Sequence, residues 1–207
     1  MQATAKRGSV TEALEILRNR IGFFGYNDGT NRTFGFLNDP NLPAYETLPA
    51  GSSGSTQWTR KSFEEITADI RLLASMLRAN TKERVDPEKD RIVMAIATSA
   101  KDALNTMNQP TTITVKEWLR QNYPAWSIES APELDNANGG ASVVYVYPER
   151  VNDGSTDDGL VFDQLVVTKL IALGAETRMK AHVEDFSNAT AGTLCKRPMA
   201  VIRAAGV

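Results

Sequence analysis

The sequence offers few side chains that could carry out acid–base or nucleophilic catalysis. It contains one histidine, His182, and one cysteine, Cys195. The Lys196 and Arg197 side chains that follow Cys195 would favour a reactive thiolate, but no general base stands beside it in the sequence. We therefore expect no catalytic site, with His182 on the surface and Cys195 as a small packed residue. The alternative, a small cytosolic enzyme, requires the fold to bring His182 and Cys195 within hydrogen-bond distance.

Other stretches contain residue types that bind ions. The run "DGSTDDG" supplies Asp153, Asp157 and Asp158, whose carboxylates suit calcium, but it lacks the twelve-residue loop pattern and the closing glutamate. We expect an exposed loop there and no metal site. The dipeptide Lys196–Arg197 could contact nucleic-acid phosphates, but two cations are a weak signal. We favour an intersubunit ion pair or a solvated turn for them.

The composition limits the class of protein. The chain has 207 residues, 42% of them hydrophobic, and a net charge of −2. It can bury a core, and it is neither a polybasic nucleic-acid binder nor a disordered acidic chain. No run reaches the roughly 18 apolar residues of a membrane span. No signal peptide opens the chain and no disulfide can form within it, so we expect a cytosolic protein.

The helices expected around these residues follow from capping and spacing. Ser9 and Glu12 form a capping-box pattern that predicts a helix from Val10 to Ile21. Apolar residues at intervals of three and four predict a well-buried helix from Lys61 to Ala79. Two shorter helices are predicted over residues 99–107 and 114–123.

The strands are predicted from apolar runs and alternation. Residues 91–97, "WSIES" and "SVVYVYP" are typical of buried strands, and the alternating residues 177–184 predict one half-buried strand. A last strand is predicted over residues 199–203. Helices and strands do not alternate regularly, which indicates an α+β fold.

A long stretch rich in glycine and proline, residues 25–56, carries Phe34 and Phe36 and therefore predicts an ordered loop rather than a linker. Its glycines do not follow a strand or open a Lys/Ser-bearing helix, so they favour turns over a phosphate cradle. The three tryptophans, including Trp58 just beyond this loop, could equally anchor an interface or fill the core.

Four stretches resemble, in the same order, the major capsid proteins of tailed phages. They are "RTFGFLNDPNLPAY", "WTRKSFEEITADI", "YPAWSIESAPELDNANGGASVVYVY" and "EDFSNATAGTLCKRPMAVIRAAGV". Because these blocks extend over nearly the whole chain, the resemblance is more specific than any single motif. The family is similar to the Hong Kong 97 capsid fold, which encapsulin shells share, and no catalytic motif belongs to it.

The resemblance implies an α+β, Hong Kong 97-type capsid fold with an A-domain and a partial P-domain, truncated at its N-terminus. The arm and E-loop are expected to be absent. The expected segments are 8–59 (end of the spine helix and P-domain loop), 60–174 (A-domain) and 175–207 (returning P-domain strands). The last strand is expected to close a P-domain sheet beside residues 177–184.

The implied function is that of a structural major capsid protein, or a prophage-encoded fragment of one. It would self-assemble into the hexamers and pentamers of an icosahedral shell and enclose double-stranded phage DNA non-specifically. Scaffold and portal proteins are further candidate partners, and no membrane partner or cofactor is expected. Its location would be the virion capsid, and the host cytoplasm before assembly. The alternative within this fold is an encapsulin-like nanocompartment.

The resemblance also directs attention to residues that could contact neighbouring subunits. We expect Trp58, Phe34, Phe36, Lys196 and Arg197 to serve as interface residues. Burial of aromatic and arginine side chains contributes much of the binding energy in protein interfaces.

Overall fold

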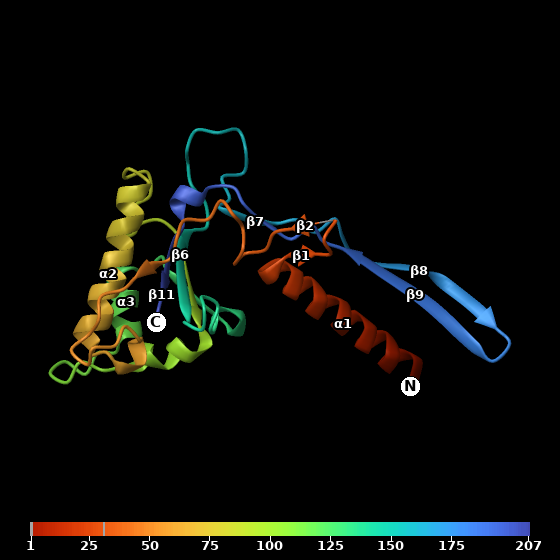
Figure 1. Cartoon of the computed structure of the whole chain (residues 1–207), viewed down its shortest axis with the longest axis horizontal. Helices are drawn as coiled ribbons and strands as arrows, with labels where there is room; N and C mark the ends of the chain where they lie inside the picture. The colour runs from red at the N-terminus through yellow and green to blue at the C-terminus, as the bar shows by residue number, and fades with distance from the viewer. Residues whose placement is uncertain (1, 31) are drawn as a thin grey trace. The chain divides into compact units, whose positions relative to one another are not determined.

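The computed structural model describes residues 2–30 and 32–207 (Figure 1). The chain divides into two compact units. Unit 1 comprises Met1–Pro40 and Phe162–Cys195, and unit 2 comprises Asn41–Val161 and Lys196–Val207. The expected segment ends at residues 59 and 174 do not coincide with these divisions. Among the described residues, no helix has the length and apolar character needed to cross a membrane.

Unit 2 is built on a five-stranded mixed sheet of order β3-β11-β6-β4-β5. The strands are β3 (Glu46–Thr47), β4 (Ile92–Ala97), β5 (Ser127–Ala131), β6 (Val143–Pro148) and β11 (Ile202–Ala205). β4 pairs parallel with β5 and antiparallel with β6, while β11 pairs antiparallel with β6 and parallel with β3. β4 and β6 are buried almost continuously, as expected for central strands covered on both faces.

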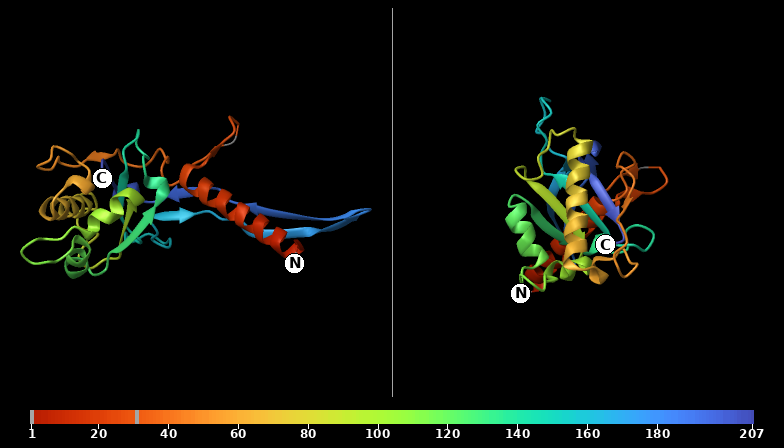
Figure 2. Two further views of the ribbon diagram at one scale, coloured as in Figure 1. Left: turned by 90° about the horizontal axis from the view of Figure 1, so that it is seen from below. Right: turned by 90° about the vertical axis from the view of Figure 1, so that its left-hand side faces the viewer.

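Two helices cover one face of this sheet. α2 (Phe63–Asn80) begins with a complete capping box between Ser62 and Glu65, and its apolar stripe is buried. α3 (Val115–Asn122) is capped by the Thr114 side chain, which accepts a hydrogen bond from the Glu117 backbone. Figures 1 and 2 show both helices on the same side of the sheet. The expected helix at 99–107 is the 3₁₀ helix η2 (Thr98–Asn105). Three shorter 3₁₀ helices are η1 (Trp58–Arg60), η3 (Pro132–Leu134) and η4 (Pro198–Ala200).

A buried polar cluster ties the loop before α2 to that helix. Lys61 Nζ lies 2.5 Å from Asp69 Oδ2 and donates a second hydrogen bond to the Pro49 carbonyl at 2.7 Å. Trp58 Nε1 donates to the same Asp69 oxygen at 2.9 Å. The Lys61 and Asp69 side chains are 1% and 5% exposed, so each charge depends on the other for its compensation.

Unit 1 begins with α1, which spans Gln2–Phe24 and is longer than predicted. The capping box expected at Ser9 and Glu12 is not the helix start. Ser9 lies inside the helix and its hydroxyl donates to the Ala5 carbonyl at 3.2 Å, as mid-helix serines often do. Short strand pairs follow and close the unit: β1 (Tyr26–Asn27) with β2 (Arg32–Thr33), and β7 (Phe162–Gln164) with β10 (Thr193–Cys195).

The most prominent feature of unit 1 is a long two-stranded antiparallel hairpin, here called the ribbon. It consists of β8 (Thr168–Arg178) and β9 (Ala181–Ala189), joined at Met179 and Lys180. Figures 1 and 2 show it as an extended pair of strands. The prediction of a single half-buried strand over 177–184 was therefore wrong, because the chain reverses in the middle of that segment.

The strand near the end of the chain also lies elsewhere than expected. β11 is not beside residues 177–184. It is inserted between β3 and β6 in unit 2, where Val201, Ile202 and Ala204 are buried. Burial of such apolar side chains stabilises the sheet by about 1.5–3 kcal/mol for each of the larger ones. The apolar character of this segment is thus explained by the core of unit 2. The mixed helix and strand content confirms the α+β class.

Candidate assembly surface

Unit 1 carries most of the exposed apolar surface of the described chain. Twelve of the fifteen large hydrophobic residues that are exposed belong to it, although it is the smaller unit. They are Val10, Ile16, Leu17, Phe24, Tyr26, Leu165, Val167, Leu170, Ile171, Leu173, Met179 and Leu194. Scattered exposed leucines are normal on a protein surface, so their concentration on one unit makes that unit the candidate assembly surface.

The ribbon accounts for a large share of this surface. Residues 169–182 are all exposed, including Ile171 at 46% and Leu173 at 67%. Among the strands of the described residues, β8 and β9 pair only with each other, so each presents an unpaired outer edge. An isolated two-stranded ribbon is marginal in water, and a long apolar edge readily accepts another strand. The ribbon therefore has the chemistry of a surface that a partner covers.

Unit 1 is held together by main-chain contacts and a few side chains. The carbonyl of Gly22 accepts hydrogen bonds from the Phe36 backbone and the Thr193 hydroxyl, both at 2.8 Å. α1 is joined to β9 by an ion pair between Arg7 and Glu184 and by Asn188 Nδ2, which donates to the Leu14 carbonyl at 3.0 Å. These contacts fix the ribbon and α1 side by side without covering their apolar side chains.

The two phenylalanines expected at an interface make ring contacts within unit 1. Phe36 packs against Phe23, with ring centroids 5.8 Å apart, and against Phe162 at 4.6 Å. Phe34 lies under the Arg32 guanidinium, 4.7 Å from ring centroid to Cζ. Both phenylalanines are half-buried. Their direct role in an interface remains a prediction.

Trp58 lies in the core of unit 2 rather than on its surface. Its side chain is fully buried and its indole N–H is bound to Asp69. Of the two placements that the sequence left open, the structure shows core packing. The expectation that Trp58 is exposed to a neighbouring subunit finds no support in this burial.

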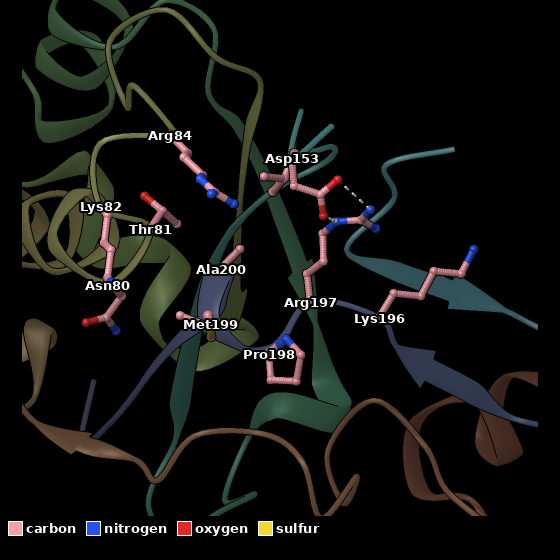
Figure 3. A pocket seen from close by; sticks show the side chains of 11 residues that line it. Asn80, Thr81, Lys82, Arg84, Asp153, Lys196, Arg197, Pro198, Met199 and Ala200 are labelled. Carbon is pink, nitrogen blue, oxygen red and sulfur yellow. Dashed lines mark hydrogen bonds and ion pairs between the residues drawn. The ribbon is translucent and has the colours of Figure 1, made fainter. Parts of the chain in front are cut away.

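Lys196 and Arg197 bind carboxylates within unit 2. Arg197 donates to Asp153 Oδ2 at 2.9 Å and to Asp157 Oδ1 at 2.5 Å, and also to the Leu160 carbonyl at 2.8 Å. Lys196 Nζ lies 3.1 Å from Asp158 Oδ1. Within the single chain these cations pair with carboxylates of the loop 152–159, an arrangement that we call the acidic-loop clamp, and their role at an interface stays a prediction. Figure 3 shows Asp153 beside Arg197.

The clamp changes the electrostatics of the loop. Hydrogen bonds from Arg197 and Ser155 hold the pKa of Asp153 and of Asp157 well below the usual range for aspartate. The Lys196 ammonium lowers the pKa of Asp158 in the same way. The carboxylates of Asp153, Asp157 and Asp158 are thus already paired with Arg197 and Lys196. Within residues 2–30 and 32–207, no group of three or more His, Cys, Asp or Glu side chains is arranged to hold a metal ion.

His182 and Cys195 lie in different parts of unit 1. His182 is exposed near the turn of the ribbon, where its Nδ1 is 3.2 Å from the Thr177 hydroxyl on β8. Cys195 is buried in β10, and its backbone N–H donates to Asp39 at 3.2 Å. From His182 to Ala189 the chain is an extended strand, which advances about 3.3 Å per residue. The pair required by the enzyme alternative is not assembled.

The ribbon is the main part of the candidate surface that the sequence did not predict. Its turn, Arg178–Met179–Lys180–Ala181, contains none of the Gly, Pro, Asn or Asp residues that usually identify a hairpin. The sequence before this turn contains the apolar run "LVVTKLIALGA". Such a run is compatible with the exposed strand that is observed, but equally with a segment buried in a core.

Comparisons with known proteins agree with this geometry. A family model described as Pa193 gp26 major capsid protein matches residues 1–206. No curated protein sequence matches the chain. A solved structure titled "The capsid of Myoviridae Phage XM1" is similar at a TM-score of 0.73 and 17% identity, covering 100% of this chain and 65% of that one. A second, the virus-like particle from Pyrococcus furiosus, is similar at a TM-score of 0.51 and 14% identity, covering 80% and 57%.

These findings confirm the resemblance and the fold. The likeness to the phage XM1 capsid extends over the whole chain and shows a phage-capsid, Hong Kong 97-like fold, while the chain spans 65% of that protein's length. The family model covers nearly every residue. The chain therefore belongs to the Pa193 gp26 major capsid protein family.

Proposed function

We propose that this chain is a shell-forming structural protein that self-assembles into the hexamers and pentamers of an icosahedral phage capsid. The observation that carries the proposal is the exposed apolar surface of unit 1, in a chain that belongs to a major capsid family. Repeated contacts between identical subunits would cover that surface around symmetry axes. We infer a structural rather than an enzymatic role because the chain belongs to a major capsid protein family.

We infer that the two units correspond to the two domains of the capsid fold. We assign unit 2, with its covered sheet, to the A-domain, and unit 1, with α1 and the ribbon, to the P-domain. In this assignment α1 is the end of the spine helix. It replaces the expected boundaries with ones that follow the packing of the chain.

The proposal extends to what the shell contains and where it acts. Phage DNA would be enclosed non-specifically, scaffold and portal proteins would be assembly partners, and the chain would reside in the host cytoplasm before it enters the virion. An encapsulin-like compartment is the less favoured reading, because the likeness to the archaeal virus-like particle is weaker in both TM-score and coverage.

The proposal is tested by particle mass. We would express this chain, and also the chain extended by any coding sequence upstream of Met1, and examine both by light scattering and negative-stain microscopy. Closed shells or capsomer rings from either are expected. A monodisperse monomer from both, at every concentration, would contradict the proposal.

A pair of matched variants then tests the surface. Leu173→Ser removes an apolar side chain that is 67% exposed on the ribbon, and Met107→Ser removes one that is 58% exposed on unit 2. We expect Leu173→Ser to impair assembly and Met107→Ser to leave it unchanged, while both retain the thermal unfolding of the parent. If the two variants assemble equally well, Leu173 and the ribbon are not part of the assembly interface.

A further inference from the structure

A pocket of about 330 Å³ lies at the end of α2, entirely within unit 2. Its apolar lining comes from Val151 and from η4, including Pro198 and the 67% exposed Met199. Lys82 and Arg84, in the turn after α2, line the same pocket (Figure 3). The pocket thus combines an apolar floor with cations at its edge.

The cations of this pocket are of two kinds. Arg197 and Lys196 are committed to the acidic loop through the clamp described above. In the described structure, the side chains of Lys82 and Arg84 form no ion pair or hydrogen bond, and both residues are exposed. Asp153, the acidic residue that lines the pocket, is held by Arg197. Two positive charges therefore remain without a carboxylate partner.

The backbone that carries Lys82 and Arg84 forms a defined turn. Lys82 and Glu83 adopt left-handed conformations, with φ of 51° and 62°, which glycine would adopt without steric cost. The turn is closed by hydrogen bonds from Glu83 N to the Arg78 carbonyl at 2.9 Å and from Arg84 N to the Thr81 carbonyl at 3.1 Å. Buried Val85 anchors its end. Strained residues with side chains often mark functional sites.

We propose that this pocket binds a carboxylate side chain, Asp or Glu, presented by a second copy of the chain. The Arg84 guanidinium can form a bidentate pair with a carboxylate, and Lys82 adds a second charge. The aliphatic stem of the incoming side chain would lie on Met199 and Pro198. This inference deepens the proposed function, on which it rests, by naming one subunit contact.

Charge complementarity favours a second copy as the source. Unit 2 contains 17 Asp and Glu residues against 15 Lys and Arg residues, so its own surface has carboxylates in excess. Glu46, Glu64 and Glu129 are exposed examples. A repeated contact between unit 2 of one copy and unit 2 of the next would pair this excess with Lys82 and Arg84.

Zero-length cross-linking tests the contact directly. Chains labelled with ¹⁴N and ¹⁵N would be mixed, allowed to assemble and treated with a carbodiimide, which joins a lysine amine only to a carboxylate in contact with it. We expect Lys82 cross-linked to an Asp or Glu peptide, with both isotopes in one product. The identity of that peptide would name the donor.

A charge-matched pair of variants gives a second readout. Lys82→Gln/Arg84→Gln is expected to raise the concentration needed for assembly at least about twofold at low salt, because exposed ion pairs contribute modestly and are screened by salt. Arg60→Gln/Lys116→Gln removes two exposed cations of unit 2 outside the pocket and is expected to assemble like the parent. Circular dichroism would establish that both variants fold.

The outcomes separate this inference from the proposed function. Shells without a mixed-isotope cross-link at Lys82, and with no difference between the two double variants, would overturn the pocket contact and leave the capsid function standing. Cross-linked dimers without rings or shells would support the contact and contradict the proposed function. Monomers alone would overturn both. Loss of binding to a DNA duplex in the pocket variant, with assembly unchanged, would reassign the pocket to nucleic acid.

Discussion

Unit 1 and unit 2 differ in how they are stabilised. Apart from Cys195, all the buried hydrophobic side chains of the described structure belong to unit 2. Unit 1 has an aromatic cluster, close main-chain contacts and a surface ion pair, while its leucines, isoleucines and valines stay at least partly exposed. Unit 2 thus contains its own core, whereas unit 1 leaves most of its large apolar side chains exposed in the single chain. Lateral association can then contribute stability that the single subunit lacks.

The largest effect on stability is expected from the buried ion pair of unit 2. Asp69→Ala leaves Lys61 buried without its carboxylate and Trp58 without its hydrogen-bond acceptor, so we expect a loss of about 3–5 kcal/mol in the free energy of unfolding. Glu149→Ala, which breaks an exposed pair with Arg91, should cost less than about 1 kcal/mol. Urea unfolding of both variants measures the difference. Similar costs would mean that unit 2 does not depend on its buried cluster.

A matched pair of leucines compares the two units directly. Leu73 is fully buried in α2 and Leu173 is 67% exposed in the ribbon. In the unassembled chain we expect Leu73→Ala to cost about 2–5 kcal/mol and Leu173→Ala to change stability by less than about 0.5 kcal/mol. Urea unfolding is the measurement. A large effect of Leu173→Ala in the monomer would show that the ribbon is already buried there.

A glycine in unit 1 tests whether close main-chain contacts hold that unit. Gly192 has a φ of +84°, and a Cβ there would lie 2.2 Å from the Phe34 carbonyl oxygen. Gly192→Ala is expected to destabilise by about 1–3 kcal/mol. Gly29 has a similar φ of +89° but open space around it. Gly29→Ala is therefore expected to lose only the stability that the unfavourable backbone conformation costs, without a steric clash. Equal thermal shifts for the two variants would argue against the contact.

The smallest and most local effect is expected at the acidic-loop clamp. Arg197→Gln should accelerate amide hydrogen exchange in residues 152–159 near neutral pH, because the loop loses its main anchor. The pKa values of Asp153 and Asp157 are lower in the folded chain than the ordinary 3.8. Their contribution is therefore complete above about pH 4 and is lost as the pH falls through the lowered values.

The parent and the Arg197→Gln variant should consequently differ in urea midpoint near neutral pH and converge in strong acid. Arg91→Gln, at an exposed pair, is the control. A difference that grows as the pH falls would show that the clamp does not act through ionised aspartates.

The sequence predicted those elements whose signals are local. The spacing of Ile66, Ile70 and Leu73 located α2 to within two residues at each end. The apolar runs located β4 and β6. In each case the side chains that decide the structure lie within one turn or one strand of each other, so pattern and fold agree.

The elements that depend on distant partners could not be obtained in this way. Nothing local indicates that β11 pairs with β3, some 158 residues earlier, as Ala204 does with Glu46. The partners of Arg197 lie 40 and 44 residues away. The ribbon lacks a turn signal, and α1 passes through Ser9 although that residue suits a helix start. The interface predictions shared this weakness, since burial of Trp58 depends on the whole of unit 2.

The place of β11 in the sheet has a consequence for the timing of folding during synthesis. β11 lies between β3 and β6, yet it follows the ribbon in the sequence. During synthesis on the ribosome, β3 and β6 are made before β11. They cannot be joined through β11 until the whole of the ribbon has been translated. Pairing across such separations is slow, and incomplete sheets expose edges. The core of unit 2 can therefore be completed only after the exposed apolar residues of the ribbon have been synthesised.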